Sequence, residues 1–341
     1  MKFTTIIFII ALIFPADLLF SQSNYQKLPA KFEANQIYIE TVTMEKDTIK
    51  FFTDTGGGGI FITQQLADNL DLKIEKEKAG GRQLMVADIP ELQSNYKIPF
   101  MHYDFDSAKE TVLNRKKDLF ANKMLVMPPA TGMNKKLQEE GVIDEGMLGQ
   151  DWFATRIWTI KYGEEELLLH NSFNSDNLRQ EHMVDLFFSK DDRNRHKTHL
   201  PRIQAYVNGE RLNFLLDTGA TTFVSNNAHK KMDDNLPPTR GASYITQSKF
   251  EKWHEENPNW QVIKKGEKFT GANYIKVPEI RIAGHTVGPV WFTTRPDQVF
   301  REHMASMMDK EIIGALGGSV FQFFQMTLHY PEEYAIFHLK E

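Results

Sequence analysis

The chain of 341 residues contains no cysteine. This absence excludes disulfide bridges, zinc sites built from thiolates, a cysteine nucleophile and a lipid-modified bacterial N-terminus. Positive charge is not in excess either, because 40 Lys and Arg residues stand against 45 Asp and Glu residues, a formal net charge of −5. Nucleic acid is therefore not an expected partner, since clustered cations are needed to neutralise a phosphate backbone.

Motifs of several common hydrolases and nucleotide-binding proteins are also missing. No Gly-x-Ser-x-Gly is present, and Trp253-His254-Glu255-Glu256 lacks the second histidine of a zinc-protease helix. The run Gly56–Gly59 lacks the Lys-Ser/Thr ending of a phosphate-binding loop. His196 and His199 lie in a charged segment, where we expect them to be solvated. The sequence therefore predicts no metal and no cofactor.

Long hydrophobic runs are confined to the N-terminus. One lysine precedes the apolar run 6–14, and Pro15 and Asp17 end it well short of the ~20 residues that span a bilayer. The pattern favours a signal peptide over residues 1–21, with cleavage after Ser21. The alternative is an uncleaved membrane anchor. We expect an exported protein, periplasmic or secreted, with no membrane span once the signal is removed.

The residues that are present indicate an all-β fold with a few short helices. Hydrophobic residues make up 41% of the chain, enough for one or two cores. Segments 37–42 and 202–207 are rich in β-branched and aromatic residues, and Asn208-Gly209 predicts a hairpin turn after the second. Short helices are expected over three segments: 63–70, 226–232 and 247–256.

The chain repeats itself once. Asp54-Thr55-Gly56 follows an apolar strand, and Asp217-Thr218-Gly219 follows another one 163 residues later. A second motif, Gly146-Met147-Leu148-Gly149, returns 168 residues later as Gly314-Ala315-Leu316-Gly317. Two motifs in the same order at nearly the same offset predict two equivalent halves.

The repeat sets the expected domain boundaries. We predict an N-terminal lobe over residues 32–170 and a C-terminal lobe over residues 200–341. Residues 171–199 are dense in Asn, Asp, Arg and Lys and are predicted to be a solvated linker. Residues 231–266, rich in charge, Pro and Asn, are predicted to be an insertion in the second lobe.

An Asp-Thr-Gly loop places one carboxylate at the end of a buried strand. Glycine permits the tight turn, and the threonine hydroxyl can bond to backbone across a junction. Two such loops related by an approximate twofold axis would bring Asp54 and Asp217 together. Two close carboxylates cannot both ionise cheaply, so they share a proton. The ionised one can then activate water while the protonated one polarises a carbonyl.

These motifs resemble the aspartic proteases of the retropepsin and pepsin superfamily, arranged as tandem retropepsin-like lobes in one bilobal chain. The resemblance covers about residues 32–170 and 200–340, with Met147-Leu148-Gly149 and Ala315-Leu316-Gly317 as the second motif of each lobe; Ile312-Ile313-Gly314 is an alternative match. The roles it implies are a catalytic dyad of Asp54 and Asp217, loop support from Thr55, Gly56, Thr218 and Gly219, and substrate-covering flaps near Gly80, Gly81, Gly271 and Ala272.

The first loop departs from the family at Gly57-Gly58-Gly59, where Ser, Thr or Ala usually follows the first glycine. The main interpretation is an exported aspartic endopeptidase, active as a monomer on a peptide or protein substrate. The glycine run motivates an alternative, a catalytically inactive peptide-binding protein on the same fold. A third possibility is a homodimer in which each lobe pairs with its copy in a second chain.

Overall fold

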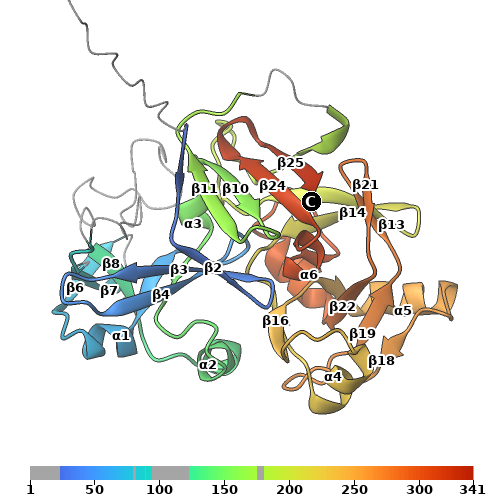
Figure 1. Cartoon of the computed structure of the whole chain (residues 1–341), viewed down its shortest axis with the longest axis horizontal. Helices are drawn as coiled ribbons and strands as arrows, with labels where there is room; N and C mark the ends of the chain where they lie inside the picture. The colour runs from blue at the N-terminus through green and yellow to red at the C-terminus, as the bar shows by residue number, and fades with distance from the viewer. Residues whose placement is uncertain (1–23, 80–81, 89, 94–122, 175–179, 341) are drawn as a thin grey trace, which may run out of the picture.

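A computed structural model describes residues 24–79, 82–88, 90–93, 123–174 and 180–340. The predicted signal peptide and the predicted flap residues Gly80 and Gly81 lie outside the described residues. The protein is mainly β with short helices, as the sequence predicted, and its strands form separate sheets in the two halves (Figure 1). Within the described part of the chain, no helix is long and apolar enough to cross a membrane.

The first half is built on an eight-stranded sheet. In pairing order its strands are β2 (Ala30–Glu33), β3 (Gln36–Val42), β4 (Thr48–Thr53), β9 (Gly146–Leu148), β5 (Ile60–Thr63), β8 (Lys123–Met127), β7 (Arg82–Asp88) and β6 (Ile74–Ala79). Its helices are α1 (Gln64–Asn69), α2 (Gly132–Glu139) and α3 (Gln150–Phe153). Strand β9 lies between β4 and β5, parallel to the first and antiparallel to the second.

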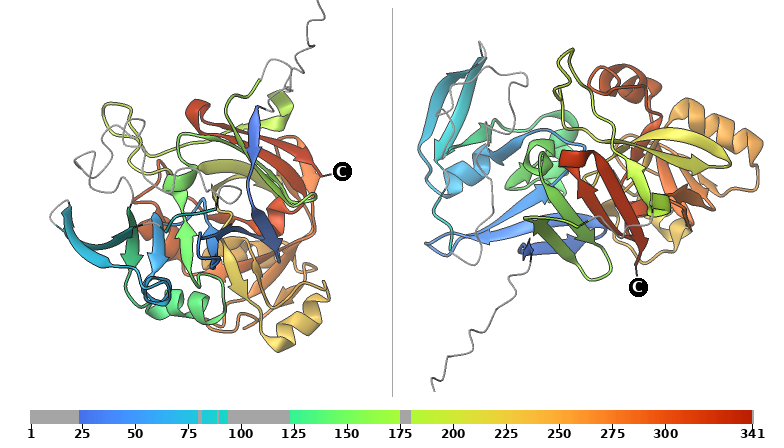
Figure 2. Two further views of the ribbon diagram at one scale, coloured as in Figure 1. Left: turned by 60° about the vertical axis from the view of Figure 1, so that its left-hand side comes forward. Right: turned by 90° about the horizontal axis from the view of Figure 1, so that it is seen from above.

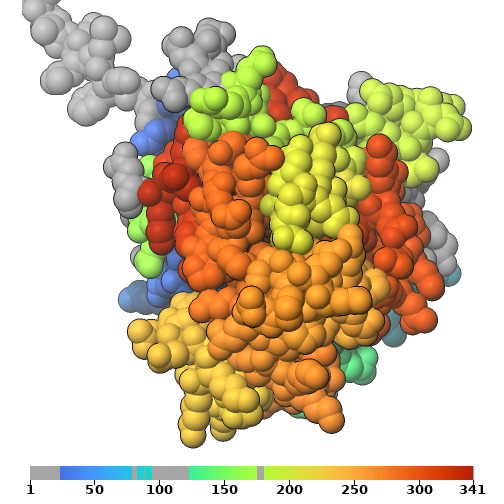
Figure 3. All heavy atoms as spheres, turned by 90° about the vertical axis from the view of Figure 1, so that its right-hand side faces the viewer, coloured from blue at the N-terminus to red at the C-terminus, as the bar shows by residue number. Residues whose placement is uncertain are grey.

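The second half repeats this arrangement in a nine-stranded sheet. Its residues, coloured yellow to red, cover most of the face of the molecule shown in Figure 3. In pairing order its strands are β18 (Val262–Ile263), β19 (Tyr274–Val277), β22 (Val290–Arg295), β17 (Tyr244–Thr246), β23 (Gly314–Leu316), β14 (Glu210–Leu216), β13 (Arg202–Val207), β20 (Ile280–Ile282) and β21 (His285–Val287). Its helices are α4 (Asn226–Met232), α5 (Gln247–Glu256), α6 (Gly318–Phe321) and a π-helix (Val299–Met304). Strand β23 lies parallel to β14 and antiparallel to β17, as β9 does between β4 and β5.

A six-stranded sheet joins the two halves (Figures 1 and 2). In pairing order its strands are β1 (Tyr25–Lys27), β11 (Glu166–His170), β10 (Ile157–Lys161), β24 (Phe324–His329), β25 (Tyr334–Leu339) and β12 (Met183–Asp185). At its centre β10 pairs with β24, and Thr159 faces Thr327 with their hydroxyl oxygens 2.8 Å apart. Each half thus contributes three strands, and the approximate twofold axis passes between these two threonines.

Strand pairing shows where the halves differ in length. Equivalent positions are 163 residues apart at Asp54 and Asp217, but 183 apart at the helix-capping Thr63 and Thr246, whose strands β5 and β17 pair alike. The offset returns to 168 at the glycine that follows β9 and β23. The second half therefore gains 20 residues just after its Asp-Thr-Gly loop, and the first half gains 15 between β5 and β9.

The predicted insertion at 231–266 is therefore misplaced. The extra residues are β15 (Thr221–Phe223), α4 and β16 (Thr239–Gly241), of which the two strands form a small sheet of their own. The sequence of β15 resembles the strand that is expected after an Asp-Thr-Gly loop, so the sequence alone does not reveal the insertion there. The alternative match at Ile312-Ile313-Gly314 is also wrong, because Ala315 pairs with β14 as Met147 pairs with β4.

The predicted solvated linker, 171–199, is wrong over its second part. Strand β12 pairs with β25, and Leu186 and Phe188 are buried. His199 is only 5% exposed, and its backbone N–H donates to Gln150 Oε1 in the first half. The charged residues of this segment pair at the surface, as Arg195 does with Asp191, so their density conceals the apolar residues between them.

The short elements expected from local sequence are confirmed. Asn208 and Gly209 form the β13–β14 turn with φ of +51° and +75°, the conformation that Asn-Gly favours. Helices α4 and α5 begin and end at the predicted residues. Helix α1 occupies most of its predicted range, and the Thr63 hydroxyl accepts from Leu66 N to cap it.

Candidate active site

The two Asp-Thr-Gly loops meet between the halves of one chain. Each leaves the end of a buried strand, β4 or β14. The backbone N–H of Asp54 donates to Leu148 O at 3.0 Å, and that of Asp217 donates to Leu316 O at 2.9 Å. The central strands β9 and β23 therefore hold the two aspartates in equivalent positions. No second copy of the chain is needed to bring the loops together.

The loop threonines bind across the junction. Thr55 N donates to Thr218 Oγ1 at 3.1 Å, and Thr218 N donates to Thr55 Oγ1 at 3.0 Å. The Thr55 hydroxyl also donates to Leu216 O at 2.8 Å. Both threonines are fully buried, so these hydrogen bonds are shielded from competing water. Thr55 and Thr218 thus support the loops, the role that the family resemblance implied for them.

The first glycine of each loop lies against the other loop's carboxylate. A Cβ on Gly56 would stand 2.5 Å from Asp217 Cγ, and one on Gly219 would stand 2.2 Å from Asp54 Cγ. Each glycine also donates its N–H to its own aspartate, Gly56 to Asp54 Oδ1 at 2.8 Å and Gly219 to Asp217 Oδ1 at 3.1 Å. Only glycine permits this approach of two backbones and two carboxylates.

The two carboxylates share a hydrogen bond and titrate as a pair. Burial raises the pKa of Asp54, while hydrogen bonds from Asp217 and from the N–H groups of Gly56, Gly57 and Gly219 oppose that rise. Burial, together with the adjacent Asp54 charge, raises the pKa of Asp217 well above its ordinary value. Both carboxyl groups therefore hold their protons to higher pH than an exposed aspartate does, because burial raises the pKa of each.

The glycine run after Asp54 has a steric reason at its second position. A Cβ on Gly57 would stand 2.1 Å from Asp54 Oδ2, whereas one on Gly58 would meet only Met147 Cε, at 3.6 Å. The Gly57 N–H also helps hold the Asp54 carboxylate. The glycine run therefore gives the Asp54 carboxylate a backbone donor, although no hydroxyl follows Gly56.

Sequence reasoning missed one residue that supports the second loop. The Tyr244 hydroxyl accepts from Thr221 N at 2.7 Å and donates to Thr221 O, and Arg295 lies 4.1 Å from the centre of the Tyr244 ring. Tyr244 begins the strand equivalent to β5. Matching Ser243–Thr246 to Ile60–Thr63, each ending in a helix-capping threonine, would have located it.

Near the loops, the halves are also joined through the end of α2. Glu140 Oε1 lies 2.6 Å from Lys268 Nζ, and Glu140 Oε2 accepts from Thr239 Oγ1 at 3.2 Å. Beside them, the rings of Phe223 and Phe269 meet edge to face at 5.0 Å, in an apolar cluster that includes Met147 of the first half. We call Glu140, Thr239, Lys268 and Phe269 the α2 bridge.

The predicted flap residues belong to two connections between paired strands. The first connection joins β6 and β7, and its Gly80 and Gly81 lie outside the described residues. Gly271 and Ala272 lie in the β18–β19 connection, where Gly271 has φ +67° and donates to Glu267 O, and Ala272 N donates to Thr270 Oγ1. The same connection carries Lys268 and Phe269 of the α2 bridge.

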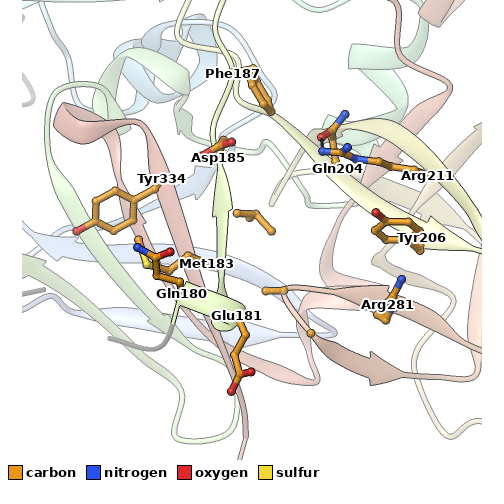
Figure 4. A pocket seen from close by; sticks show the side chains of 13 residues that line it. Gln180, Glu181, Met183, Asp185, Phe187, Gln204, Tyr206, Arg211, Arg281 and Tyr334 are labelled. Atoms are coloured by element: carbon orange, nitrogen blue, oxygen red, sulfur yellow. Dashed lines mark hydrogen bonds between the residues drawn. The ribbon is translucent and has the colours of Figure 1, made fainter. Parts of the chain in front are cut away.

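The described residues contain no cluster of three or more His, Asp and Glu side chains arranged to hold a metal ion. A cavity of about 520 Å³ lies away from the aspartates, beside β12, β13 and β20. Figure 4 shows Arg211 and Arg281 on either side of Tyr206 along its wall.

Comparison with models of known protein families gives no match, and comparison with curated proteins also gives none. The arrangement that can perform chemistry is therefore defined by geometry: two adjacent carboxyl groups and the backbone donors of two interlocked loops.

Proposed function

We propose that the protein is an exported aspartic endopeptidase, which hydrolyses peptide bonds with a water molecule activated by Asp54 and Asp217. The observation that carries this proposal is the reciprocal contact of the two loops, in which each glycine lies against the opposite carboxylate. Hydrogen bonds between Thr55 and Thr218 fix that contact. The pair supplies one base and one acid at the same place, without a metal.

In this proposal the two carboxyl groups take opposite roles, one as base and one as acid. Asp54, ionised, accepts a proton from the water while the water oxygen attacks the carbonyl carbon. Asp217, protonated, donates its proton to the carbonyl oxygen, so a neutral tetrahedral diol forms and the shared charge passes to Asp217. In the second step Asp54 returns its proton to the leaving nitrogen, and Asp217 recovers one from a diol hydroxyl as the C–N bond breaks. Both carboxyl groups end in their starting states.

An extended peptide fits this arrangement best, because it presents its carbonyl groups along a line between two β-rich halves. The rival interpretation, a catalytically inactive peptide-binding protein, was motivated by the missing hydroxyl after Gly56. The N–H of Gly57 interacts with the Asp54 carboxylate, so the missing hydroxyl is a weaker reason to prefer that alternative.

The test uses purified mature protein and a mixed peptide library across pH ~3 to 8, a range that brackets a coupled carboxylate pair. New termini are identified by mass spectrometry for the wild type, Asp217→Asn, and Asp185→Asn as a control at an exposed residue outside the loops. We expect cleavage by the wild type and the control and none by Asp217→Asn. If folded wild type leaves the library intact at every pH, the endopeptidase proposal fails, and retention of peptides on the protein would support the binding alternative.

A further inference from the structure

The arginines that line two cavities of the second half differ in how far they are exposed. In the cavity of Figure 4, Arg211 and Arg281 are exposed; Arg211 donates to Gln204, and Arg281 lies 4.3 Å from the centre of the Tyr206 ring. Both guanidinium groups are thus open to solvent. A second cavity, of about 240 Å³, is lined by an arginine in a different situation.

Arg240 lies on β16, opposite Thr222 on β15, with a side chain only 6% exposed. Its Nη1 donates to Asp234 Oδ2 at 2.6 Å. Its Nε and Nη2 are buried and have no hydrogen-bond partner among the described residues. A guanidinium carries five N–H donors, and leaving buried donors of a charged group unpaired is costly. The described residues around the cavity therefore supply no hydrogen-bond acceptor for these two nitrogen atoms.

Other groups in the lining also favour a negatively charged ligand. Lys276 adds a second positive charge to the lining, against the single negative charge of Asp234. Thr293, also in the lining, has a buried hydroxyl without a partner in the described part of the chain. The cavity thus offers a net positive charge and a free hydroxyl, which together suit an oxyanion.

The remaining wall has an apolar part and a polar part. Val224, Met232, Leu236, Val290 and Trp291 belong to the apolar part, and Thr222, Ser243, Tyr274, Ser319 and Gln322 to the polar part. The cavity volume of about 240 Å³ is more than a bare carboxylate fills. A short apolar group attached to the anion would occupy the rest.

We propose that this cavity binds a small organic acid, whose carboxylate pairs with Arg240 and Lys276 and whose apolar tail packs among Leu236, Val290 and Trp291. Arg240 supplies the planar pair of donors that matches a carboxylate, and Thr293 supplies one more. This inference does not depend on the proposed endopeptidase activity.

The cavity adjoins Gly241 and Ala242, at the end of β16, which contact the second Asp-Thr-Gly loop and the first half. Gly241 and Ala242 line the cavity, and Ala242 N donates to Ala220 O at 2.7 Å, three residues after Asp217. Gly241 N donates to Ala34 O of the first half at 2.8 Å. An occupant therefore contacts the segment that connects the loop with the other half.

Binding is tested on the full mature chain by isothermal titration and by the shift in Tm, with N-acetyl-L-leucine as the probe. N-acetyl-L-leucinamide, which has the same tail but no charge, and inorganic phosphate, which has the charge but no tail, are the comparison ligands. We expect the acid to bind and to raise Tm, and both comparison ligands to bind at least about tenfold more weakly. Arg240→Gln should weaken the acid about tenfold or more, while the exposed Arg281→Gln leaves its affinity unchanged.

Equal binding of the acid and the amide would overturn the proposal, as would unchanged affinity in Arg240→Gln. Tighter binding of phosphate than of the acid would overturn the assignment of a carboxylate with a tail. If Arg240→Gln does not fold, Thr293→Val decides, because it removes a buried hydroxyl with little change in shape. That variant should weaken the acid by about threefold or more, the loss of one hydrogen bond, and an unchanged affinity would count against the site.

Discussion

The two halves of the protein hold the same Asp-Thr-Gly loop by different means. In the first, the chain reaches the next strand six residues after Asp54, and the close approach of glycine backbone supports the carboxylate. In the second, 20 additional residues intervene, and side chains support the loop: Thr221 Oγ1 donates to Gly219 O at 2.9 Å, and the Tyr244 hydroxyl binds Thr221. The interlocked centre is thus preserved while its supports differ.

The surroundings of the two carboxylates also differ. The N–H groups of Gly56, Gly57 and Gly219 favour the ionised form of Asp54. Asp217 receives N–H groups from Gly219 and Ala220 but bears the charge of its neighbour as well as burial. Burial raises the pKa of both carboxyl groups, although the N–H groups and charges around them are unequal.

The largest expected effect comes from adding one methyl group to the first loop at Gly57. Its Cβ would stand 2.1 Å from Asp54 Oδ2, so the carboxylate must move. We expect Gly57→Ala to lower stability by about 1–3 kcal/mol, as overpacking does. We also expect kcat/KM to fall about 100-fold or more, the effect of displacing a catalytic group by an ångström. Thermal unfolding and cleavage of a fluorogenic peptide measure the two effects.

Gly58→Ala is the matched control, one residue further along the same run. Its Cβ would meet only Met147 Cε, at the ordinary contact distance of 3.6 Å. Activity within about twofold of wild type is expected, because no atom of the site has to move. Equal damage from the two substitutions would show that the loop needs flexibility throughout, rather than space at one position.

The second comparison concerns the two threonines. Thr55→Val leaves Thr218 N–H and Leu216 C=O without their partner, whereas Thr218→Val removes the acceptor of Thr55 N–H. At about 1–3 kcal/mol for each buried group left unpaired, the first variant should lose roughly twice the free energy of unfolding lost by the second. Urea unfolding of both variants tests this, and equal losses would show that the exchange is symmetric in energy.

The sequence was sufficient for the parts of this comparison that depend on local pattern. Two Asp-Thr-Gly motifs after apolar strands, and two later glycine motifs, located both loops and the strands that hold them. Caps such as Thr246 and the Asn-Gly turn work through neighbouring atoms, so their residues could be identified before any tertiary contact was known.

Other features could not be predicted because they depend on distance in space. The need for glycine at position 57 follows from its approach to a carboxylate, which one sequence does not reveal. Strand β15 has the composition of the strand it displaces, so the insertion was placed too late. His199 was expected in water, yet it lies beside Asp151 of the first half, with Nδ1 3.3 Å from Oδ1.

The third prediction uses pH to separate the carboxylates. The pKa of Asp217 is raised in the folded protein, so its stabilising contribution is complete below the unfolded pKa of about 3.8 and is lost as pH rises through the folded pKa. Asp217→Asn cannot ionise and should therefore become steadily more stable relative to wild type as pH rises from 4. Tm measured from pH 4 to 8 follows this difference.

Asp191 provides a comparison in which stability changes with pH in the opposite direction. Hydrogen bonds from Arg195 lower its pKa to about 2, so its contribution is present above pH ~3.8 and is lost as pH falls toward 2. Asp191→Asn should thus lose stability relative to wild type as pH rises from 2 to 4. A flat difference between Asp217→Asn and wild type would contradict the raised pKa of Asp217.

The smallest expected effect concerns the α2 bridge. Lys268 and Glu140 lie 2.6 Å apart with side chains 49% and 25% exposed, so their pair should contribute only about 0.2–1 kcal/mol and weaken with salt. Lys27 and Glu166 form a control pair at the same distance and similar exposure, but they join strands β1 and β11 of one half. Double-mutant cycles in urea should give similar coupling energies for the two pairs.

The kinetics should nevertheless separate the two pairs. Lys268→Gln loosens a contact between the halves near the interlocked loops, so a substrate that must lie between the halves should meet a changed KM. Lys27→Gln leaves that contact intact, and its KM should equal that of wild type. Because the two substitutions remove similar stabilising energy, a shift in KM for Lys268→Gln alone would assign the effect to the position of the bridge rather than to lost stability. Equal KM values would mean that substrate enters without opening the α2 bridge.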